Sequence, residues 1–207
     1  VGIDPAEAHV VVVGATGAIG RLASLMLARR AKQLTLVGNA GNSFAHKFLD
    51  KVADEVVHAL SNELPTPRGG GLSACVRDLL PPQGEVVKKG LAEEFAQICD
   101  LNGLPSPITA TTHLDDALQT ADLVLVATSS DGAFLDPTQL QPGTVVCDVA
   151  RPPNVAQADL SDNGVLVFDG GLVKPPFAVK LGPFQNLPDD LCWGCLGETM
   201  LLALEGE

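Results

Sequence analysis

The chain has 207 residues, of which 46% are hydrophobic and only 4% aromatic, with 25 acidic against 13 basic side chains. Its formal net charge of −12 would repel nucleic acid and anionic membrane surfaces, so we expect neither as a partner. No apolar run approaches the roughly 18 residues that a membrane span needs. The five cysteines are an odd number without a secreted disulfide framework, which predicts a reducing, cytoplasmic location.

The N-terminal stretch combines an apolar strand, a glycine-rich turn and a helix. The four valines 10–13 are typical of a central parallel strand that is buried on both faces. Gly14, Gly17 and Gly20 follow at a spacing of three, where the usual fingerprint is G-x-G-x-x-G, and an apolar helical pattern starts at Ile19. A strand that turns sharply into a helix leaves backbone N–H groups unpaired. This favours a pyrophosphate site over a purely structural turn.

Strand and helix patterns alternate along most of the chain. The expected strands are 10–13, 33–38, 122–127, 144–148 and 164–168. The expected helices are 21–31, 44–60, 89–101 and 114–120. In the first helix we expect Leu22, Leu25, Met26 and Leu27 on the buried side. The alternation predicts an α/β fold with a doubly wound, mostly parallel, Rossmann-like sheet whose strand ends build a ligand crevice.

The segment 61–107 interrupts this alternation. Prolines and glycines divide it into short pieces, and it is longer than an ordinary crossover connection. We expect a helical and irregular insertion in one domain spanning 1–207, serving as a lid or as a contact in a homo-oligomer. The chain opens at Val1 almost directly into a strand, without an initiator Met or signal peptide, and stops at Glu207 just after a helix. We therefore expect a piece of a longer protein.

The end of the second strand is where dinucleotide-binding proteins select their cofactor. Enzymes that use NAD place an acidic residue there to bind the ribose 2′-hydroxyl, while enzymes that use NADP avoid that charge. Here Asn39, Asn42 and Ser43 follow the strand, with no acid before Asp50. These side chains can donate hydrogen bonds, so the pattern favours NADP over NAD, although no arginine is present for a 2′-phosphate.

The second half of the chain carries further motifs. They are Thr128 to Gly132, Asp136-Pro137, Asp148 with Pro152 and Asn154, Gly170-Gly171, and the stretch from Cys195 to Gly206. Together with the glycine turn, they resemble the cofactor domain of the cyanobacterial long-chain acyl-[acyl-carrier-protein] reductases, over most of the chain outside 61–107. Shikimate dehydrogenases and glutamyl-tRNA reductases share the glycine motif, so the stretch that starts at Cys195 is the more discriminating part.

The resemblance implies an enzyme that uses NADPH to reduce a fatty acyl thioester of acyl carrier protein or coenzyme A to an aldehyde. In that family a cysteine forms an acyl-enzyme thioester, and the matching position is Cys195. The expected cofactor-binding residues are Gly14, Thr16, Gly17, Ala18, Ile19, Asn39, Ser43, Thr128, Ser129, Gly170 and Gly171. Asn39 stands where the family has an arginine, and Thr128 stands where it has a serine.

The chemistry of Cys195 can be judged from its position alone. It opens an apolar-periodic segment, which predicts the first turn of a helix, where a thiolate is stabilised and N–H groups can hold an oxyanion. A thiolate attacks an acyl thioester readily, and the new thioester accepts hydride. The alternatives are a buried structural cysteine and a redox dithiol with Cys192. No metal-ligand set at suitable spacing is evident.

These patterns leave three hypotheses for function. The first is NADPH-dependent reduction of an acyl thioester to an aldehyde through Cys195. The second is an NAD(P) oxidoreductase of the shikimate dehydrogenase or glutamyl-tRNA reductase type, without a covalent intermediate and with a structural Cys195. The third is a nucleotide-binding regulatory module that has no chemistry of its own.

Overall fold

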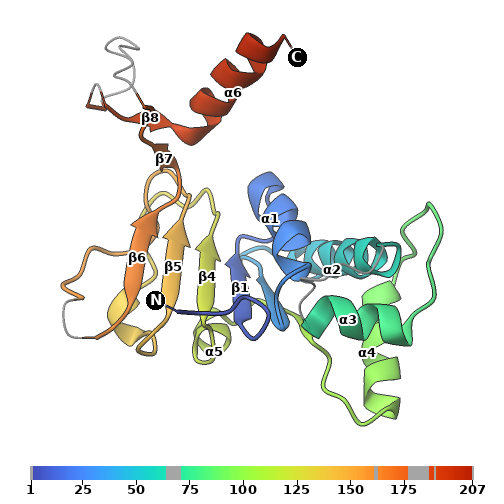
Figure 1. The fold of residues 1–207 in the computed structure, drawn as a ribbon. Helices are drawn as coiled ribbons and strands as arrows, with labels where there is room; N and C mark the ends of the chain where they lie inside the picture. The colour runs from blue at the N-terminus through green and yellow to red at the C-terminus, as the bar shows by residue number, and fades with distance from the viewer. Residues whose placement is uncertain (1, 64–70, 161–162, 177–186, 189, 207) are drawn as a thin grey trace.

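The computed structural model describes residues 2–63, 71–160, 163–176, 187–188 and 190–206. Six of its strands form a parallel sheet in the order β3-β2-β1-β4-β5-β6 (Figure 1). This is the strand order of the doubly wound Rossmann fold, so the expected fold class is confirmed. Residues 64–70 of the expected insertion lie outside the described residues.

The sheet has helices on both faces and a small hairpin beyond its last strand. The strands are β1 His9–Val13, β2 Gln33–Val37, β3 Ile108–Thr111, β4 Leu123–Val126, β5 Val145–Asp148 and β6 Leu166–Asp169. The helices are α1 Ala18–Ala28, α2 Ala45–Ser61, α3 Gly71–Leu79, α4 Leu91–Leu101, α5 Leu114–Leu118 and α6 Gly194–Glu205, with a 3-10 turn at Pro137–Gln139. The antiparallel pair β7 Leu172–Val173 and β8 Cys192–Trp193 leads into α6. Among the described residues, no helix is both long and apolar enough to cross a bilayer.

Strand β3 was not expected from the sequence, and it completes one edge of the sheet. It pairs with β2 along its whole length, from Leu34 with Ile108 to Val37 with Thr111. Its sequence, Ile-Thr-Ala-Thr, is short and half polar, and only Ile108 is buried, so no hydrophobic run marks it. Strands β7 and β8, which follow the last expected strand, were also not predicted. Each has 2 residues, too few to show any periodicity.

Helix α1 buries only part of the face that its large side chains predict, because Leu25 and Leu27 pack against the core and two others do not. Leu22 and Met26 are 60% and 58% exposed, whereas Gly20 and Ala28 are buried. A Cβ on Gly20 would overlap the carbonyl oxygen of Gly14, so the helix lies too close to the turn for any side chain there. Small residues bring the start of α1 against the end of β1, and Leu22 and Met26 remain exposed.

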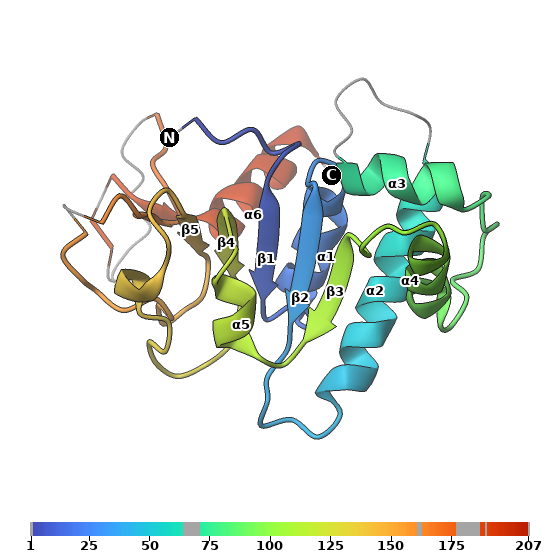
Figure 2. The same cartoon turned by 90° about the horizontal axis from the view of Figure 1, so that it is seen from below.

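The described part of the expected insertion packs into the main core. Helices α3 and α4 lie beside α2 (Figure 2), and Leu72 and Phe95 are fully buried in the apolar cluster that also contains residues of β1 and β2. The Asp54 carboxylate of α2 accepts the backbone N–H groups of Gly90 and Ala92, each at 2.9 Å. This buried carboxylate therefore caps the start of α4 and joins the two helices.

Replacing Asp54 by alanine should destabilise the protein, because the carboxylate is only 4% exposed and holds two backbone donors. Hydrogen bonds to charged groups contribute about 1.5–3 kcal/mol, so we expect the free energy of unfolding to fall by about 2 kcal/mol. Urea unfolding followed by circular dichroism measures this change. Asp50→Ala removes an exposed carboxylate from the same helix and should change it by less than about 0.5 kcal/mol. Equal losses in the two variants would contradict the capping role.

Candidate functional site

A cleft of about 770 Å³ opens at the carboxyl edge of the sheet. It lies between the ends of β1 and β4, where the strand order reverses, and open α/β sheets bind their ligands at such a point. The expected cofactor residues that line it are Gly14, Thr16, Gly17, Ala18, Ile19, Asn39, Thr128 and Ser129. The structure therefore brings together residues from three separate segments of the chain. Ser43, Gly170 and Gly171 do not line this cleft.

The glycine turn presents backbone donors to the cleft. Gly14 has a φ of 83°, and a Cβ there would lie 2.6 Å from the carbonyl oxygen of Ala127, so β1 and β4 approach closely at this turn. Gly17 is the N-cap of α1 and has no side chain that could cap the helix. Within the described residues, the N–H groups of Ala18 and Ile19 have no hydrogen-bond acceptor. Such donors at a helix N-terminus fit an anionic group.

The electrostatic character of the cleft differs from that of the protein as a whole. Although the net charge is −12, none of the described residues that line the cleft is charged. Asn39 accepts the N–H of Gly41 at 2.8 Å, and Asn42 accepts the N–H of Phe44 at 2.9 Å. Because the Oδ1 atoms are engaged, the two amides present their Nδ2 groups as donors.

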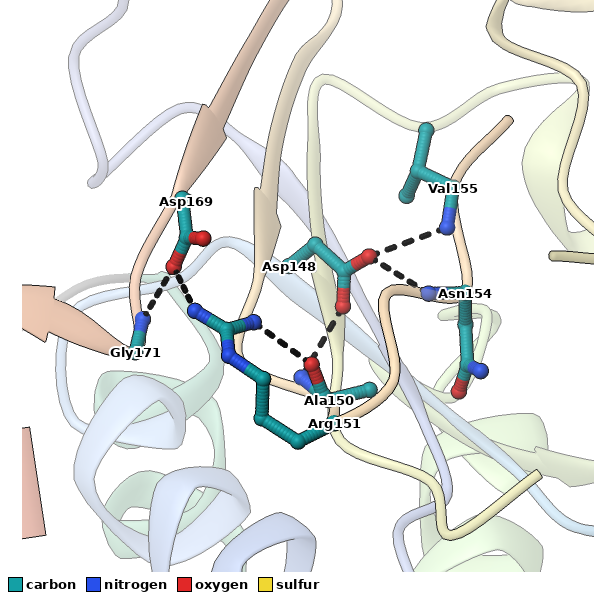
Figure 3. A network of polar contacts seen from close by, with 7 residues as sticks. All are labelled: Asp148, Ala150, Arg151, Asn154, Val155, Asp169 and Gly171. Atoms are coloured by element: carbon teal, nitrogen blue, oxygen red, sulfur yellow. Dashed lines mark hydrogen bonds and ion pairs between the residues drawn. The ribbon is translucent and has the colours of Figure 1, made fainter. Parts of the chain in front are cut away.

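The buried side chain of Asn154 holds the β4 side of the cleft. Its Nδ2 donates to the carbonyl oxygens of Ser130 and Gly132, at 3.1 and 3.0 Å, and its Oδ1 accepts from the Thr128 hydroxyl. The buried Asp148 carboxylate accepts the Asn154 backbone N–H at 2.7 Å (Figure 3). The loops that follow β4 and β5 thus form one hydrogen-bonded unit. Since Thr128 donates to Asn154, its hydroxyl can only accept a hydrogen bond from a ligand.

Arg151 connects the loop after β5 to the ends of β6 and β8. Its guanidinium pairs with Asp169, donates to the Ala150 carbonyl oxygen at 2.6 Å and lies over the Trp193 ring, with Cζ 4.9 Å from the ring centroid. Asp169 also accepts the Gly171 N–H at 2.8 Å (Figure 3). A Cβ on Gly171 would lie 2.9 Å from a guanidinium nitrogen, so this glycine makes room for Arg151.

Cys195 is exposed in the first turn of α6, so the predicted helix position is confirmed. The Gly194 N–H donates to the Gly171 carbonyl oxygen at 2.9 Å, which attaches the start of α6 to the end of β6. In the part of the chain that the structure describes, no acceptor is found for the N–H groups of Cys195 and Leu196. Cys195 does not line the 770 Å³ cleft, but α6 lies beyond the same carboxyl edge of the sheet (Figure 1).

The other four cysteines are in less reactive surroundings. Cys99 and Cys192 are buried. Burial, reinforced by the neighbouring Cys99 thiol, raises the pKa of Cys75 to about 11. Burial also raises the pKa of Cys147, and two nearby aspartates raise it further. The thiolate fraction of Cys75 and Cys147 is therefore small near neutral pH.

Some cleft residues were not found by the sequence analysis. Thr112 and Leu114 follow β3, the strand without a hydrophobic run, and they reach the cleft because β3 lies beside β2. Phe134 belongs to the loop after β4, as does Ser130, which lies within the Thr128 to Gly132 motif but was not expected to bind the cofactor. Because both residues follow a strand that was predicted, their position at a strand end could have identified them. Among the described residues, no group of three or more potential ligands could hold a metal ion.

Comparisons with known proteins give partial and distant likenesses. No protein-family model matches the chain. A stretch of 104 residues is 38% identical to the aminotransferase PigE of Serratia sp. (strain ATCC 39006), and it covers 48% of this chain but only 12% of that protein. The nucleotide-binding domain of Thermoplasma volcanium glutamyl-tRNA reductase is 16% identical, with a TM-score of 0.35 over 77% of this chain and 74% of that one. Thermococcus litoralis Δ1-pyrroline-2-carboxylate reductase, in complex with NADH and L-proline, is 11% identical, with a TM-score of 0.38 over 72% and 31%.

Iodoacetamide should modify Cys195 before any other cysteine at neutral pH. Cys195 is exposed, whereas the raised pKa values of Cys75 and Cys147 limit their thiolate fractions. A brief exposure followed by peptide mass spectrometry gives the order of modification. In alkaline buffer Cys147 should begin to react, because thiolate forms as the pH approaches its raised pKa. Modification of Cys147 as fast as Cys195 at neutral pH would contradict this ranking.

Proposed function

We propose that this domain binds NADPH in the cleft and uses Cys195 to reduce an acyl thioester to an aldehyde. The observation that carries the proposal is the presence of two helix N-termini at one edge of the sheet. One belongs to α1 and lines the cleft, and the other belongs to α6 and carries the exposed Cys195. The resemblance of the second half of the chain to long-chain acyl-[acyl-carrier-protein] reductases supplies the choice of substrate.

The residues of the cleft fit a dinucleotide. The N–H groups of Ala18 and Ile19 suit a pyrophosphate, and Gly17 lets the phosphates approach the backbone. The Nδ2 groups of Asn39 and Asn42 suit a 2′-phosphate, and no acid lines the described end of β2 to accept from a 2′-hydroxyl. We therefore propose NADPH in preference to NADH. When bound, it supplies hydride.

Cys195 performs the covalent steps in this proposal. Its thiolate, in the first turn of α6, attacks the carbonyl carbon of the acyl thioester. The bond to the carrier sulfur breaks, and the carrier leaves as a thiol after taking up a proton. The backbone N–H groups of Cys195 and Leu196 stabilise the oxyanion. The acyl group on Cys195 then accepts hydride, and departure of the aldehyde regenerates the thiolate.

The proposed carrier is acyl carrier protein or coenzyme A, and the proposed compartment is the cytoplasm, where thiols stay reduced. The partial relative PigE is named an aminotransferase, and the chain matches only 12% of it. An aldehyde is an amino acceptor in aminotransfer reactions. The name of that relative is therefore compatible with aldehyde production by the shared segment.

Incubation with an acyl-CoA, without NADPH, should add one acyl mass to Cys195, because no hydride is present to release the acyl group. Intact and peptide mass spectrometry detect the adduct, and NADPH should then remove it as aldehyde. Cys195→Ser should abolish the adduct and lower turnover by more than about 100-fold. Cys75→Ser makes the same atomic change on α3 and should leave both properties unchanged. Full turnover by Cys195→Ser would exclude a covalent role for this thiol.

Asn39→Asp should shift the cofactor preference toward NADH by about tenfold, which corresponds to roughly 1.4 kcal/mol. The added carboxylate would accept from a ribose 2′-hydroxyl and repel a 2′-phosphate, and it can still accept the Gly41 N–H. Fluorescence titration gives the ratio of the two dissociation constants. Gln33→Glu adds the same charge at the opposite end of β2 and should change that ratio by less than about twofold. An unchanged ratio in Asn39→Asp would argue against binding of the ribose at this strand end.

A further inference from the structure

We infer that Arg151 is a positioning residue for Cys195 and acts through the Trp193 ring. The inference rests on the proposed function, because it concerns the placement of the proposed nucleophile. Trp193 is the N-cap of α6 and lies two residues before Cys195. Whatever fixes the indole ring therefore fixes the first turn of the helix that carries the thiol.

Helix α6 depends on its first turn for its position. None of its described residues is buried, and in Figure 1 it extends away from the sheet beyond β7 and β8. Among the described residues, the hairpin that carries it contains two residue pairs, Leu172 with Trp193 and Val173 with Cys192. So short a hairpin is weak alone. The contacts of Trp193 with Arg151 and of Gly194 with Gly171 therefore help to set the direction of the helix.

Arg151 supplies the charged one of these contacts. Among the ion pairs of the described residues its side chain is the most buried cation, at 28% exposure against 49% or more for the others. Its guanidinium edge pairs with Asp169, and its face lies over Trp193. The Gly194 N–H donates to the carbonyl oxygen of Gly171, which packs against the same guanidinium. One planar cation therefore lies against both attachments of α6.

The same residue relates α6 to the cleft. Arg151 lies in the loop after β5. The Asp148 carboxylate stabilises this loop by accepting the backbone N–H groups of Ala150 and Asn154 (Figure 3). Asn154 also fixes Thr128 and Ser130, which line the cleft. Arg151 therefore belongs to the hydrogen-bonded loops after β4 and β5 that form one side of the cleft. Loss of this group would move Cys195 relative to the cofactor without removing any residue from the cleft.

Arg151→Met tests the inference, because it keeps the apolar stem and removes the guanidinium. We expect kcat for acyl-CoA reduction to fall about tenfold or more, since small misplacements of a nucleophile slow the reaction strongly. The dissociation constant for NADPH and the KM for acyl-CoA should change by less than about twofold. Arg151→Lys should not restore kcat, because an ammonium group cannot pair with Asp169 and stack on Trp193 together.

The chain has a single tryptophan, so its fluorescence reports on this contact without any need for activity. In Arg151→Met, we expect acrylamide to quench Trp193 about twice as fast, because the ring loses its cover. Trp193→Leu should lower kcat as Arg151→Met does, and Trp193→Phe, which keeps a ring for the cation, should recover most of it. The double variant Arg151→Met/Trp193→Leu should be no slower than the slower single variant.

Lys174→Met is the matched control, because it breaks an exposed ion pair with Asp190 close to the same hairpin. It should leave kcat and Trp193 quenching unchanged. Wild-type kcat or wild-type quenching in Arg151→Met would overturn the inference. Failure of the proposed function gives a different result, since Cys195→Ser would then keep its turnover while Trp193 quenching still reports whether Arg151 holds the ring.

Discussion

The close approach of α1 to the end of β1 is the constraint on which the candidate site depends. Gly20 lies so near the Gly14 carbonyl oxygen that it tolerates no side chain, and a Cβ on Gly14 would overlap the backbone of Ala127, the residue that follows β4. This packing brings the unpaired N–H groups of the helix start to the point where the sheet reverses its strand order. As a consequence of this packing, the apolar side chain of Leu22 is exposed on α1.

Hydrophobic runs and helical periodicity in the sequence predicted the strands and helices that such patterns mark. The valine strand before Gly14 and the helix that starts beside Cys195 were found because hydrophobic runs and periodicity mark them. The buried face of α1 was predicted only in part, because the close contact with the turn after β1 leaves Leu22 and Met26 exposed while Leu25 and Leu27 pack against the core. Contacts distant in sequence left no local signal, such as the one between Asn154 and Thr128, 26 residues apart.

The two halves of the sheet position their strand ends by different means. In the first half, helices α1 and α2 pack against the strands through a large apolar cluster. Between β4 and β6, the described connections contain only the 3-10 turn at Pro137–Gln139, and buried residues such as Leu135 and Val155 pack into a second apolar cluster. The buried polar groups of Asp148 and Asn154 add hydrogen bonds to this packing where the loops must hold a defined shape.

The net charge of the protein and the uncharged lining of the cleft act on an anionic ligand over different distances. A protein of net charge −12 opposes the approach of anionic cofactors and carriers, and that effect extends over about a Debye length of 8–10 Å at physiological salt. The described cleft lining adds no further negative charge, and its N–H and amide donors act only at contact distance. Binding must therefore rely on directed hydrogen bonds rather than on net attraction. A rigid turn at Gly14 and a rigid attachment of α6 through Arg151 are what such short-range recognition requires.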